Sequence, residues 1–517
     1  GIDFVTEFKP KLLTNIVNML PGYNTKEESA VTLKGEFAYM IPDPNTKRSR
    51  IPQDNNEPVA YVDDMEGAKK IVSLGTNYST WTLASAPADT SIGDTITVRS
   101  NNRGRFIWYN NPNQQVSIKD IFPARDVQPG QDMITPLYVQ FNPNKRGRYN
   151  YSSNYTTQTG VFNQSVNRRQ VWGGMMKFLN TTSTDLLNEN INFIEFNMRI
   201  ETSNPSALKN GKLVIDLGTI SEDVIPNGKL DTEDSLRNGI LRNEFDIGLD
   251  FFVDERELEY YNSINGTSLS LSDFESGDPA LDNNDPTGTT ANQGIYDLIN
   301  GTQFNAIYEG GNRPDTEDLN RNGRSDLSNS YFKYEISLDT TANRYISGTG
   351  KEGTGWFQYS IPLSEFVEKV GQADLRNIEY ARVWIAGVED SLRLAFVDFN
   401  LVGNQWFKPD RSDTSYTISV VSIEENPQIY QSPVPGNVLR QEIQNTTGVN
   451  TLSNESSLSI GVSNLVNGER KLAIKDFRTQ TLDLFNYKML KLFVNGDPTF
   501  NYTSEDVYDA TMLIRLG

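Results

Sequence analysis

Alternation of apolar and polar side chains along short segments constrains the fold of this chain most. Residues 192–201 place Ile, Phe, Met and Ile on one predicted face and Glu, Asn, Arg and Glu on the other. Residues 211–218 and 393–402 repeat the pattern. In the last segment, one predicted side carries Ala395, Val397, Phe399 and Leu401. A period of two with one polar face is typical of antiparallel strands covered on one side, so the sequence predicts an all-β sandwich.

The pattern divides the chain into three predicted parts. These are an N-terminal segment (1–58), a jelly-roll sandwich (59–406) and a second, incomplete sandwich (415–517). Acidic, Gly-rich and Pro-rich stretches without periodicity predict long loop insertions in the jelly roll, at 228–290 and 309–330. We expect the boundary between the two sandwiches within the polar stretch 405–415.

The N-terminal segment begins with a predicted short amphipathic helix at 11–20. Leu12, Ile16 and Leu20 share one helical face, and Pro21-Gly22 ends the pattern. We expect this face to pack on the sandwich, with an interfacial role as the alternative. A strand prediction follows at 35–42.

Composition excludes several classes of function. The 517 residues carry a net charge of −20, which disfavours binding to nucleic acid and leaves Ca²⁺, basic protein surfaces or mere solubility as explanations. The chain has no Cys and no His, so thiol nucleophiles, Ser-His-Asp triads and His or Cys zinc sites are excluded. Catalysis by carboxylates alone, as in glycoside hydrolysis, is not excluded by these absences, but we expect no enzyme.

The termini and hydropathy add a second set of expectations. The sequence contains no run of about 20 apolar residues, so it predicts no membrane-spanning helix. The N-terminal residues lack the basic and apolar regions of a signal peptide. The last residues end within a strand-like run, so we expect the chain to be a segment of a longer protein.

One loop has the spacing of a cation site. The side chains of Asp318, Asn320, Asn322 and Asp326 supply oxygen at loop positions 1, 3, 5 and 9, and Gly323 stands at position 6. This spacing is typical of a Ca²⁺ loop, although Asn329 replaces the acid expected at position 12. Asp315 or Glu317 could compensate. The alternative is an Asx-rich turn that binds no ion.

Two further motifs have a functional and a structural interpretation. The acids of Asp63-Asp64-Met65-Glu66 resemble the opening strand of galactose-binding-like jelly rolls, and we expect structural hydrogen bonds or an ion contact there rather than catalysis. Trp172 precedes Gly173-Gly174, a pair that allows close backbone approach, and we expect the Trp in the core rather than as a sugar platform. For Trp356, Trp384 and Trp406 the sequence leaves core and platform open.

Five phrases in order resemble the SprA (Sov) family of the type IX secretion and gliding machinery. They are AYVDDMEGA (60–68), VWGGMMKFLN (171–180), GKLVIDLGTISEDVI (211–225), PDTEDLNRNGRSD (314–326) and WFQYSIPLSEF (356–366). The resemblance covers about residues 30–517. The insertion of DTEDSLRNGILRNEF after residue 230 departs from the family's pattern.

The resemblance implies a role in protein export to the cell surface. SprA-type proteins form a large outer-membrane barrel with soluble sandwich domains inserted between strands, and residues 35–42 would then be a barrel-derived strand. A PorV-like outer-membrane barrel, a plug protein and secreted cargo are the implied partners. We therefore expect a non-catalytic soluble portion of the translocon that shapes or caps the secretion path. The alternative function is a secreted, Ca²⁺-stabilised carbohydrate-binding jelly roll.

Overall fold

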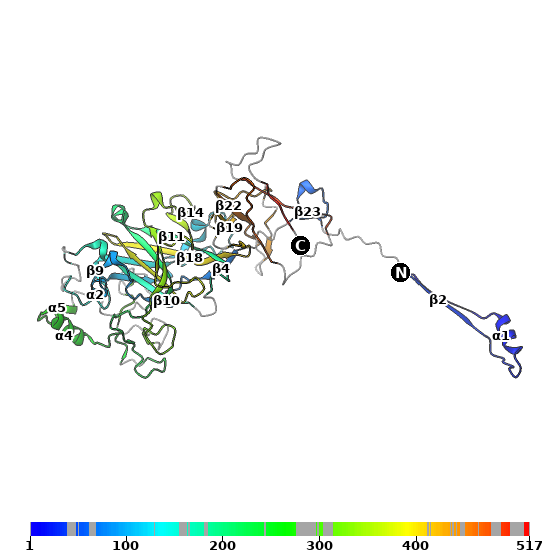
Figure 1. Cartoon of the computed structure of the whole chain (residues 1–517), viewed down its shortest axis with the longest axis horizontal. Coiled ribbons are helices and arrows are strands. Elements are labelled where there is room, and N and C mark those ends of the chain that lie inside the picture. Colours follow the sequence, from blue (N-terminus) through cyan, green and yellow to red (C-terminus); the bar gives the residue numbers. More distant parts are fainter. Residues whose placement is uncertain are drawn as a thin grey trace. The chain divides into compact units, whose positions relative to one another are not determined.

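The computed structural model describes most of the chain. The described residues are 2–38, 48–49, 51–61, 69–128, 130–154, 163, 166–179, 185–241, 245–275, 296, 299–302, 314–410, 413, 415–434, 436, 439–440, 442–444, 450–463, 465–476, 487–496 and 511–515. Contacts divide the chain into two units, one of Gly1–Val62 with Gln480–Gly517 and the other of Asp63–Thr479. Each unit is described separately (Figure 1).

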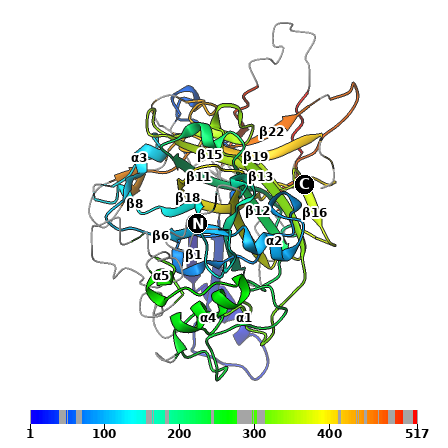
Figure 2. The same cartoon turned by 90° about the vertical axis from the view of Figure 1, so that its left-hand side faces the viewer.

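The larger unit is built on two antiparallel sheets (Figures 1 and 2). The first, sheet C, runs in the order β14 (Ile346–Thr349), β15 (Trp356–Pro362), β11 (Ile191–Glu201), β18 (Leu392–Asn404), β9 (Leu137–Arg146) and β6 (Gly104–Tyr109), with β4 (Lys69–Ser73) also paired to β18. The second, sheet D, runs in the order β16 (Glu368–Val370), β13 (Ser330–Ser337), β12 (Lys212–Thr219), β17 (Tyr380–Ala386), β10 (Gly173–Phe178) and β5 (Thr82–Leu83).

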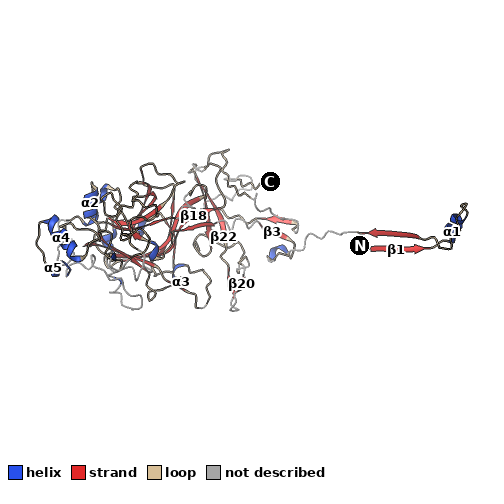
Figure 3. Cartoon of the chain, turned by 90° about the horizontal axis from the view of Figure 1, so that it is seen from below, coloured by secondary structure: helices blue, strands red, loops and turns tan. Residues whose placement is uncertain are grey.

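The two sheets share one apolar core. Ile194, Phe196 and Met198 of β11 are buried in the same cluster as Leu213 and Ile215 of β12. Alternation places these side chains on the inner faces of their sheets, where burial of apolar area stabilises the sandwich. The predicted all-β sandwich is confirmed, and few helices accompany the strands (Figure 3).

The prediction that four apolar residues of β18 share one face is wrong, because the strand contains a bulge. Phe399 and Leu401 are buried in the core between the sheets, but Ala395 and Val397 belong to a different cluster on the outer side of sheet C. Asp398 has φ of 53°, and the pairing of β11 with β18 shifts register at this point. An extra residue in one strand reverses the alternation that follows it. The four residues therefore do not lie on one side.

The outer face of sheet D is covered by an irregular segment. Val214 and Trp384 are buried with Ala84, Ala86 and Ile92, which come from the stretch after β5. Polar groups lie beneath the same stretch, and Lys333 Nζ donates to Asp89 Oδ2 at 2.8 Å. This sheet is thus buried on both faces.

The predicted loop insertion at 228–290 contains helix. Its described part includes α4 (Asp254–Asn265) and α5 (Leu271–Glu275). Acidic residues in the first turn of α4 favour the helix N-terminus, and Gly266 ends the helix with φ of 64°. Within the part of 309–330 that is described, residues 314–329 are irregular.

Short elements complete the larger unit. They are α2 (Ile96–Asn101), α3 (Ile118–Ile121), and the strand pairs β7 (Val116–Ser117) with β8 (Met133–Ile134), β19 (Tyr416–Ser422) with β22 (Ser456–Val462), and β20 (Glu442–Gln444) with β21 (Asn450–Leu452). Residues on both sides of the predicted boundary at 405–415 belong to this unit. The three predicted domains, with a second sandwich at 415–517, stay predictions.

The smaller unit contains the predicted N-terminal helix. Strand β1 (Ile2–Phe8) pairs with β2 (Val31–Phe37), and α1 (Lys11–Asn18) lies between them in sequence. Leu12 and Ile16 of α1 are 68% and 50% exposed, and the expected packing of this face on the sandwich stays a prediction. A parallel pair joins β3 (Val59–Tyr61) to β23 (Met489–Lys491). Among the described helices, none has the length and apolar character needed to cross a membrane.

Candidate functional site

The predicted cation loop gathers its four side chains in one turn. Asp318 accepts the backbone N–H of Asn322 at 2.8 Å and that of Gly323 at 2.7 Å through its two carboxylate oxygens. The side-chain amides of Asn320 and Asn322 donate to Asp326 Oδ2 at 2.6 Å and 3.0 Å. The structure therefore brings Asp318, Asn320, Asn322 and Asp326 together, as the spacing predicted.

The donor set is made of oxygen, but only half of it is acidic. Carboxylate and amide oxygens are the ligands that Ca²⁺ prefers, so the loop fits this ion chemically. The described part of the chain holds no group of three or more His, Cys, Asp or Glu side chains placed to bind a metal. The internal hydrogen bonds are those of an Asx-rich turn.

The loop belongs to an internal repeat that the pattern analysis missed. A Ser or Thr is followed by Glu-Asp, three variable residues and Asn-Gly at 221–228, 232–239 and 316–323. The three copies lie in two segments about 80 residues apart, on either side of the helices α4 and α5. The repeat could have been found from the sequence, because the second copy begins eleven residues after the first.

Each copy forms the same turn. Asp223 accepts the N–H groups of Asn227 and Gly228, and Asp234 accepts those of Asn238 and Gly239, as Asp318 does in its own loop. The glycines have φ of 71°, 72° and 78°, a left-handed conformation that Gly adopts without a Cβ clash. The repeat is therefore a structural unit in which the Asp holds the turn closed.

The glutamates of the first and third copies are exchanged between their loops. Glu317 accepts the N–H groups of Val224, Ile225 and Asp231 at 2.7 to 3.0 Å. Glu222 in turn accepts the N–H groups of the other loop, those of Leu319, Asn320 and Asp326, at 3.0 to 3.3 Å. Both carboxyl groups are essentially buried, with 0% and 1% exposure for Glu222 and Glu317. Each loop is therefore held by the glutamate of the other.

Backbone hydrogen bonds follow the same reciprocal pattern. The N–H of Glu222 donates to the carbonyl of Asp326 at 2.7 Å, and the N–H of Glu317 donates to that of Asp231 at 3.0 Å. Because Glu317 faces the loop at 223–231, it does not supply the missing ligand of the loop at 318–326, contrary to expectation. Glu222, which the sequence did not single out, is the acid that contacts that loop.

Burial shifts the titration of these carboxyl groups. It raises the pKa of Glu317 to about 8, and the neighbouring carboxylates Asp231 and Asp223 act in the same direction. Burial also raises the pKa of Glu222, against the hydrogen bond donated by Tyr380 at 2.7 Å. Burial and the nearby Asp315 likewise raise the pKa of Glu233. Glu317 and Glu222 accept backbone N–H groups, so their role here is to hold the loops in place.

The tryptophans are core residues, with one intermediate case. Trp172, Trp356 and Trp384 are at most 2% exposed, so the predicted packing of Trp172 is confirmed. A Cβ at Gly174 would lie 2.6 Å from Trp384 Cβ, which shows why this pair of strands needs Gly. Trp406 is half-buried. Asp63 and Glu66 lie outside the described residues.

Comparison with known proteins connects part of the chain to a family. Residues 301–517 match the family model SprA_N, described as a motility related/secretion protein. No curated protein matches the chain. The match includes the third copy of the repeat and β13 to β23.

Proposed function

We propose that this chain is a non-catalytic portion of an outer-membrane translocon of type IX secretion, because residues 301–517 match the SprA_N family model of motility related/secretion proteins. In this role it shapes or caps the path of exported proteins and docks partners or cargo. The family match carries the proposal, and the ordered phrases at 60–68, 171–180 and 211–225 extend the resemblance toward the N-terminus.

Two features of the chain support a binding or scaffolding role rather than catalysis. The absence of His and Cys from the sequence removes the commonest general base and the thiol nucleophile. The described acids with raised pKa in the repeat, such as Glu222 and Glu317, bind backbone N–H groups. Turnover of a glycan or peptide substrate by the purified protein would contradict the non-catalytic role.

The proposed setting is the outer membrane, outside the cytoplasm. A PorV-like outer-membrane barrel, a plug protein and secreted cargo are the proposed partners, because the family's resemblance implies them. The net charge of −20 suits contact with basic protein surfaces. Nucleic acid is not a proposed partner.

The proposal is tested in cells that carry the gene. Replacing residues 314–326 by a Gly/Ser linker of equal length is expected to reduce export of a secreted protein and gliding, while the amount of the parent protein in the outer membrane stays unchanged. Affinity purification should recover the PorV-like barrel and the plug protein with the unchanged chain. Normal export and gliding after replacement of either this loop or the whole of 69–404 would contradict the proposal.

We further propose that the loop at 318–326 binds Ca²⁺ through Asp318, Asn320, Asn322 and Asp326. The ion would hold the loop by charge where Asn amides now donate to Asp326, and its chemistry would be structural. Addition of a chelator is expected to lower the melting temperature, and the variant Asp318→Asn should no longer respond. The loop at 223–231 offers a comparison within the chain, because Ile225 stands where Asn320 supplies oxygen. A melting temperature that ignores chelator would leave the Asx turn as the explanation.

The alternative function, a carbohydrate-binding module, loses the platform it was expected to use. Five of the six tryptophans are buried, namely Trp81, Trp108, Trp172, Trp356 and Trp384. Glycan binding through an exposed Trp is therefore not proposed.

A further inference from the structure

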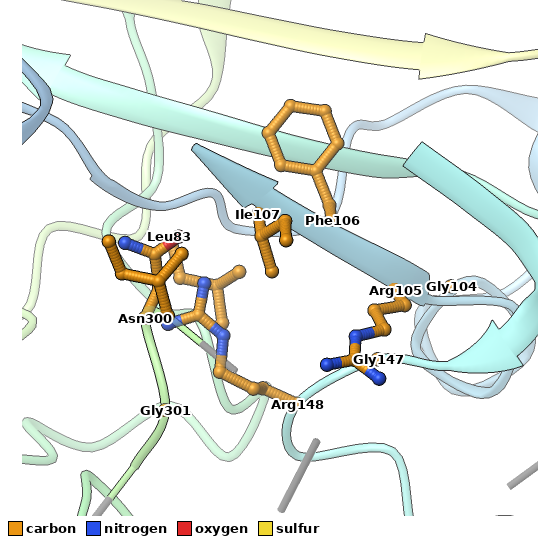
Figure 4. A pocket seen from close by; sticks show the side chains of 10 residues that line it. Leu83, Gly104, Arg105, Phe106, Ile107, Gly147, Arg148, Asn300 and Gly301 are labelled. Atoms are coloured by element: carbon orange, nitrogen blue, oxygen red, sulfur yellow. The ribbon is translucent and has the colours of Figure 1, made fainter. Parts of the chain in front are cut away.

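A groove with a volume of about 570 Å³ lies on the outer face of sheet C. Strands β6, β9, β18 and β11 form its floor, and residues that follow β11 and precede β18 form one end. A smaller pocket beside it shares Arg105 and Ile107 of β6. In Figure 4, Arg105 points to the side of β6 opposite to Phe106, which belongs to the core.

The register of the strands aligns the groove residues in one row. Ile107 of β6 is paired with Gln140 of β9, Gln140 with Arg393 of β18, and Arg393 with Glu201 of β11. Neighbours that are paired across strands lie on the same face of a sheet, about 5 Å apart. The floor of the groove is thus a continuous line across four strands, built on the rigid part of the fold.

Hydrogen bonds hold the central groups in place. Glu201 is fixed between two arginines, because Arg393 Nε donates to Oε2 at 2.6 Å and Arg199 Nε donates to Oε1 at 2.9 Å. Arg393 also donates to Gln114 Oε1 at 2.9 Å, and its guanidinium lies 4.7 Å from the centre of the Tyr138 ring. Gln140 donates to the hydroxyl of Tyr109 at 3.1 Å. A ligand would therefore meet groups that are already oriented.

The groove is positively charged in a strongly acidic chain. Among the described residues that line it, Lys145, Arg393 and Arg105 are cations and Glu201 is the one carboxylate. Arg199, which also holds Glu201, adds a further cation at its edge. Lys145 forms no ion pair with any part of the chain that the structure describes. In a chain with a net charge of −20, a local excess of cations concentrates anions at that place. The ligand should therefore carry negative charge.

The remaining lining favours hydroxyl groups over apolar ones. Gln140, Asn142, Thr202, Ser203 and Ser391 supply neutral donors and acceptors. The apolar residues of the lining are buried: Phe141 and Leu392, 1% and 3% exposed, belong to the core between the sheets, and Ile107, 6% exposed, belongs to the cluster on the outer side of sheet C. The groove offers few subsites for apolar peptide side chains, whereas a sugar can use each polar group. We propose that this groove binds an anionic carbohydrate, a few sugar units that carry carboxylate or phosphate groups.

Titration calorimetry of the whole chain with an α-1,4-linked trigalacturonate tests the proposal. The charged trimer is expected to bind at least tenfold more tightly than a neutral galactose trimer of the same linkage, and raised salt should weaken it. The variant Lys145→Glu should reduce the affinity at least tenfold. The variant Lys351→Glu makes the same charge change at an exposed position outside the groove and should leave binding unchanged.

Further measurements separate the sources of such a ligand and the alternatives. Wild-type binding to vesicles that contain a phosphorylated glycolipid, abolished by Lys145→Glu, would also support the proposal and would assign a lipid-borne sugar. Equal affinity for the charged and neutral trimers, or equal effects of the two lysine variants, would overturn it. Tighter binding of a tri-glutamate peptide than of any sugar would overturn it in favour of an acidic peptide. The proposal does not depend on the translocon role, since it concerns the purified chain.

Discussion

Among single residues, Asp216 and Arg382 form the most deeply buried ion pair in the described part of the chain. Both side chains are 0% exposed, and Arg382 Nε donates to Asp216 Oδ2 at 2.8 Å. Trp384 Nε1 donates to the same oxygen at 3.0 Å, and the Arg382 guanidinium lies 4.8 Å from the Tyr331 ring. Burial raises the pKa of Asp216 against the effect of the arginine. Removing one partner should therefore cost much more than removing both.

We expect Arg382→Met to lower the free energy of unfolding by about 3–5 kcal/mol, because it leaves a buried carboxylate without its cation. The double variant Asp216→Leu/Arg382→Met should recover part of the loss. Denaturant unfolding followed by fluorescence measures both. Lys212→Met is the control, since Lys212 pairs with Glu335 at a partly exposed position and should change stability by at most about 1 kcal/mol. A single variant no worse than this control would contradict the argument.

Sequence patterns could place the inward residues but not this pair. The alternation of 211–218 assigned Leu213, Ile215 and Leu217 to the core correctly. Asp216 alternates onto the opposite face, which would lie in water if the strand were covered on one side only. The covering segment after β5 comes from a distant part of the chain, about 125 residues earlier. No local pattern reports such a cover, so the buried charge could not be predicted.

Among the elements, the two exchanged loops are the clearest case of mutual support. We expect Glu317→Ala to destabilise the protein by about 2–4 kcal/mol, because three backbone N–H groups lose their acceptor. Hydrogen exchange should increase in the loop at 223–231, not only beside the substitution. Glu222→Ala should instead loosen the loop at 318–326.

Glu352 is exposed, so Glu352→Ala is the control for these two variants. It should not change hydrogen exchange in either loop. The crossed pattern is what separates the brace from an ordinary turn. If each variant increases hydrogen exchange only in the loop that contains the substitution, the glutamates do not stabilise each other's loops.

The stability of helix α4 should depend on pH, because two carboxyl groups share one tyrosine hydroxyl. The hydroxyl of Tyr151 contacts Asp250 and also Glu257 of α4, the latter at 2.7 Å. One hydroxyl proton cannot serve two carboxylates, so one of the acids must supply a proton. Burial raises the pKa of Asp250 to about 6, so this carboxyl holds a proton below that pH and can then donate it within the contact with Tyr151.

Since the folded-state pKa of Asp250 is raised, its contribution to stability is present below its ordinary pKa near 3.8 and is lost as the pH rises through about 6. We expect the protection of the α4 amides from hydrogen exchange to fall by about tenfold between pH 5 and 7, after correction for intrinsic rates. Asp250→Asn should remove the pH dependence of the α4 amides and leave the protection of the sheet amides unchanged. Unchanged protection across this range in the unmodified protein would contradict the assignment.

Element predictions succeeded where one periodicity ran without interruption. Strand β11 and the helix α1 form where their patterns predict them. Strand β12 also forms where predicted, but it is buried on both faces. In β18 the bulge at Asp398 reversed the faces, because a single left-handed residue leaves no mark on the polarity pattern. Helix α4 has weak amphipathicity and lies in an acidic stretch, although its acidic first turn and Gly266 were usable signals. For the loop at 318–326, spacing predicted the gathering of four side chains, whereas Glu222 required a long-range contact.

At the scale of the larger unit, the residues after 415 are bonded to sheet C. Lys69 Nζ on β4 pairs with Glu195 of β11 at 3.0 Å and with Glu425 at 2.6 Å. Asn426 donates to Gln358 of β15 at 3.2 Å. Arg125 pairs with Glu424 at 2.9 Å, an acid that is also held by Arg440 at 3.0 Å. The polar stretch at 405–415 therefore joins segments that share an interface.

Cutting the chain at this stretch tests whether the interface makes one cooperative unit. We place a specific protease site between Lys408 and Asp410 and expect the two fragments to co-elute after cleavage and to unfold in one transition. Paired and hydrogen-bonded groups on both sides oppose separation, as at Lys69 and Glu425. The uncut protein with the same insertion is the control, and Lys69→Met should promote separation after cleavage. Fragments that part without denaturant, or two distinct transitions, would instead support the predicted boundary and an independent domain at 415–517.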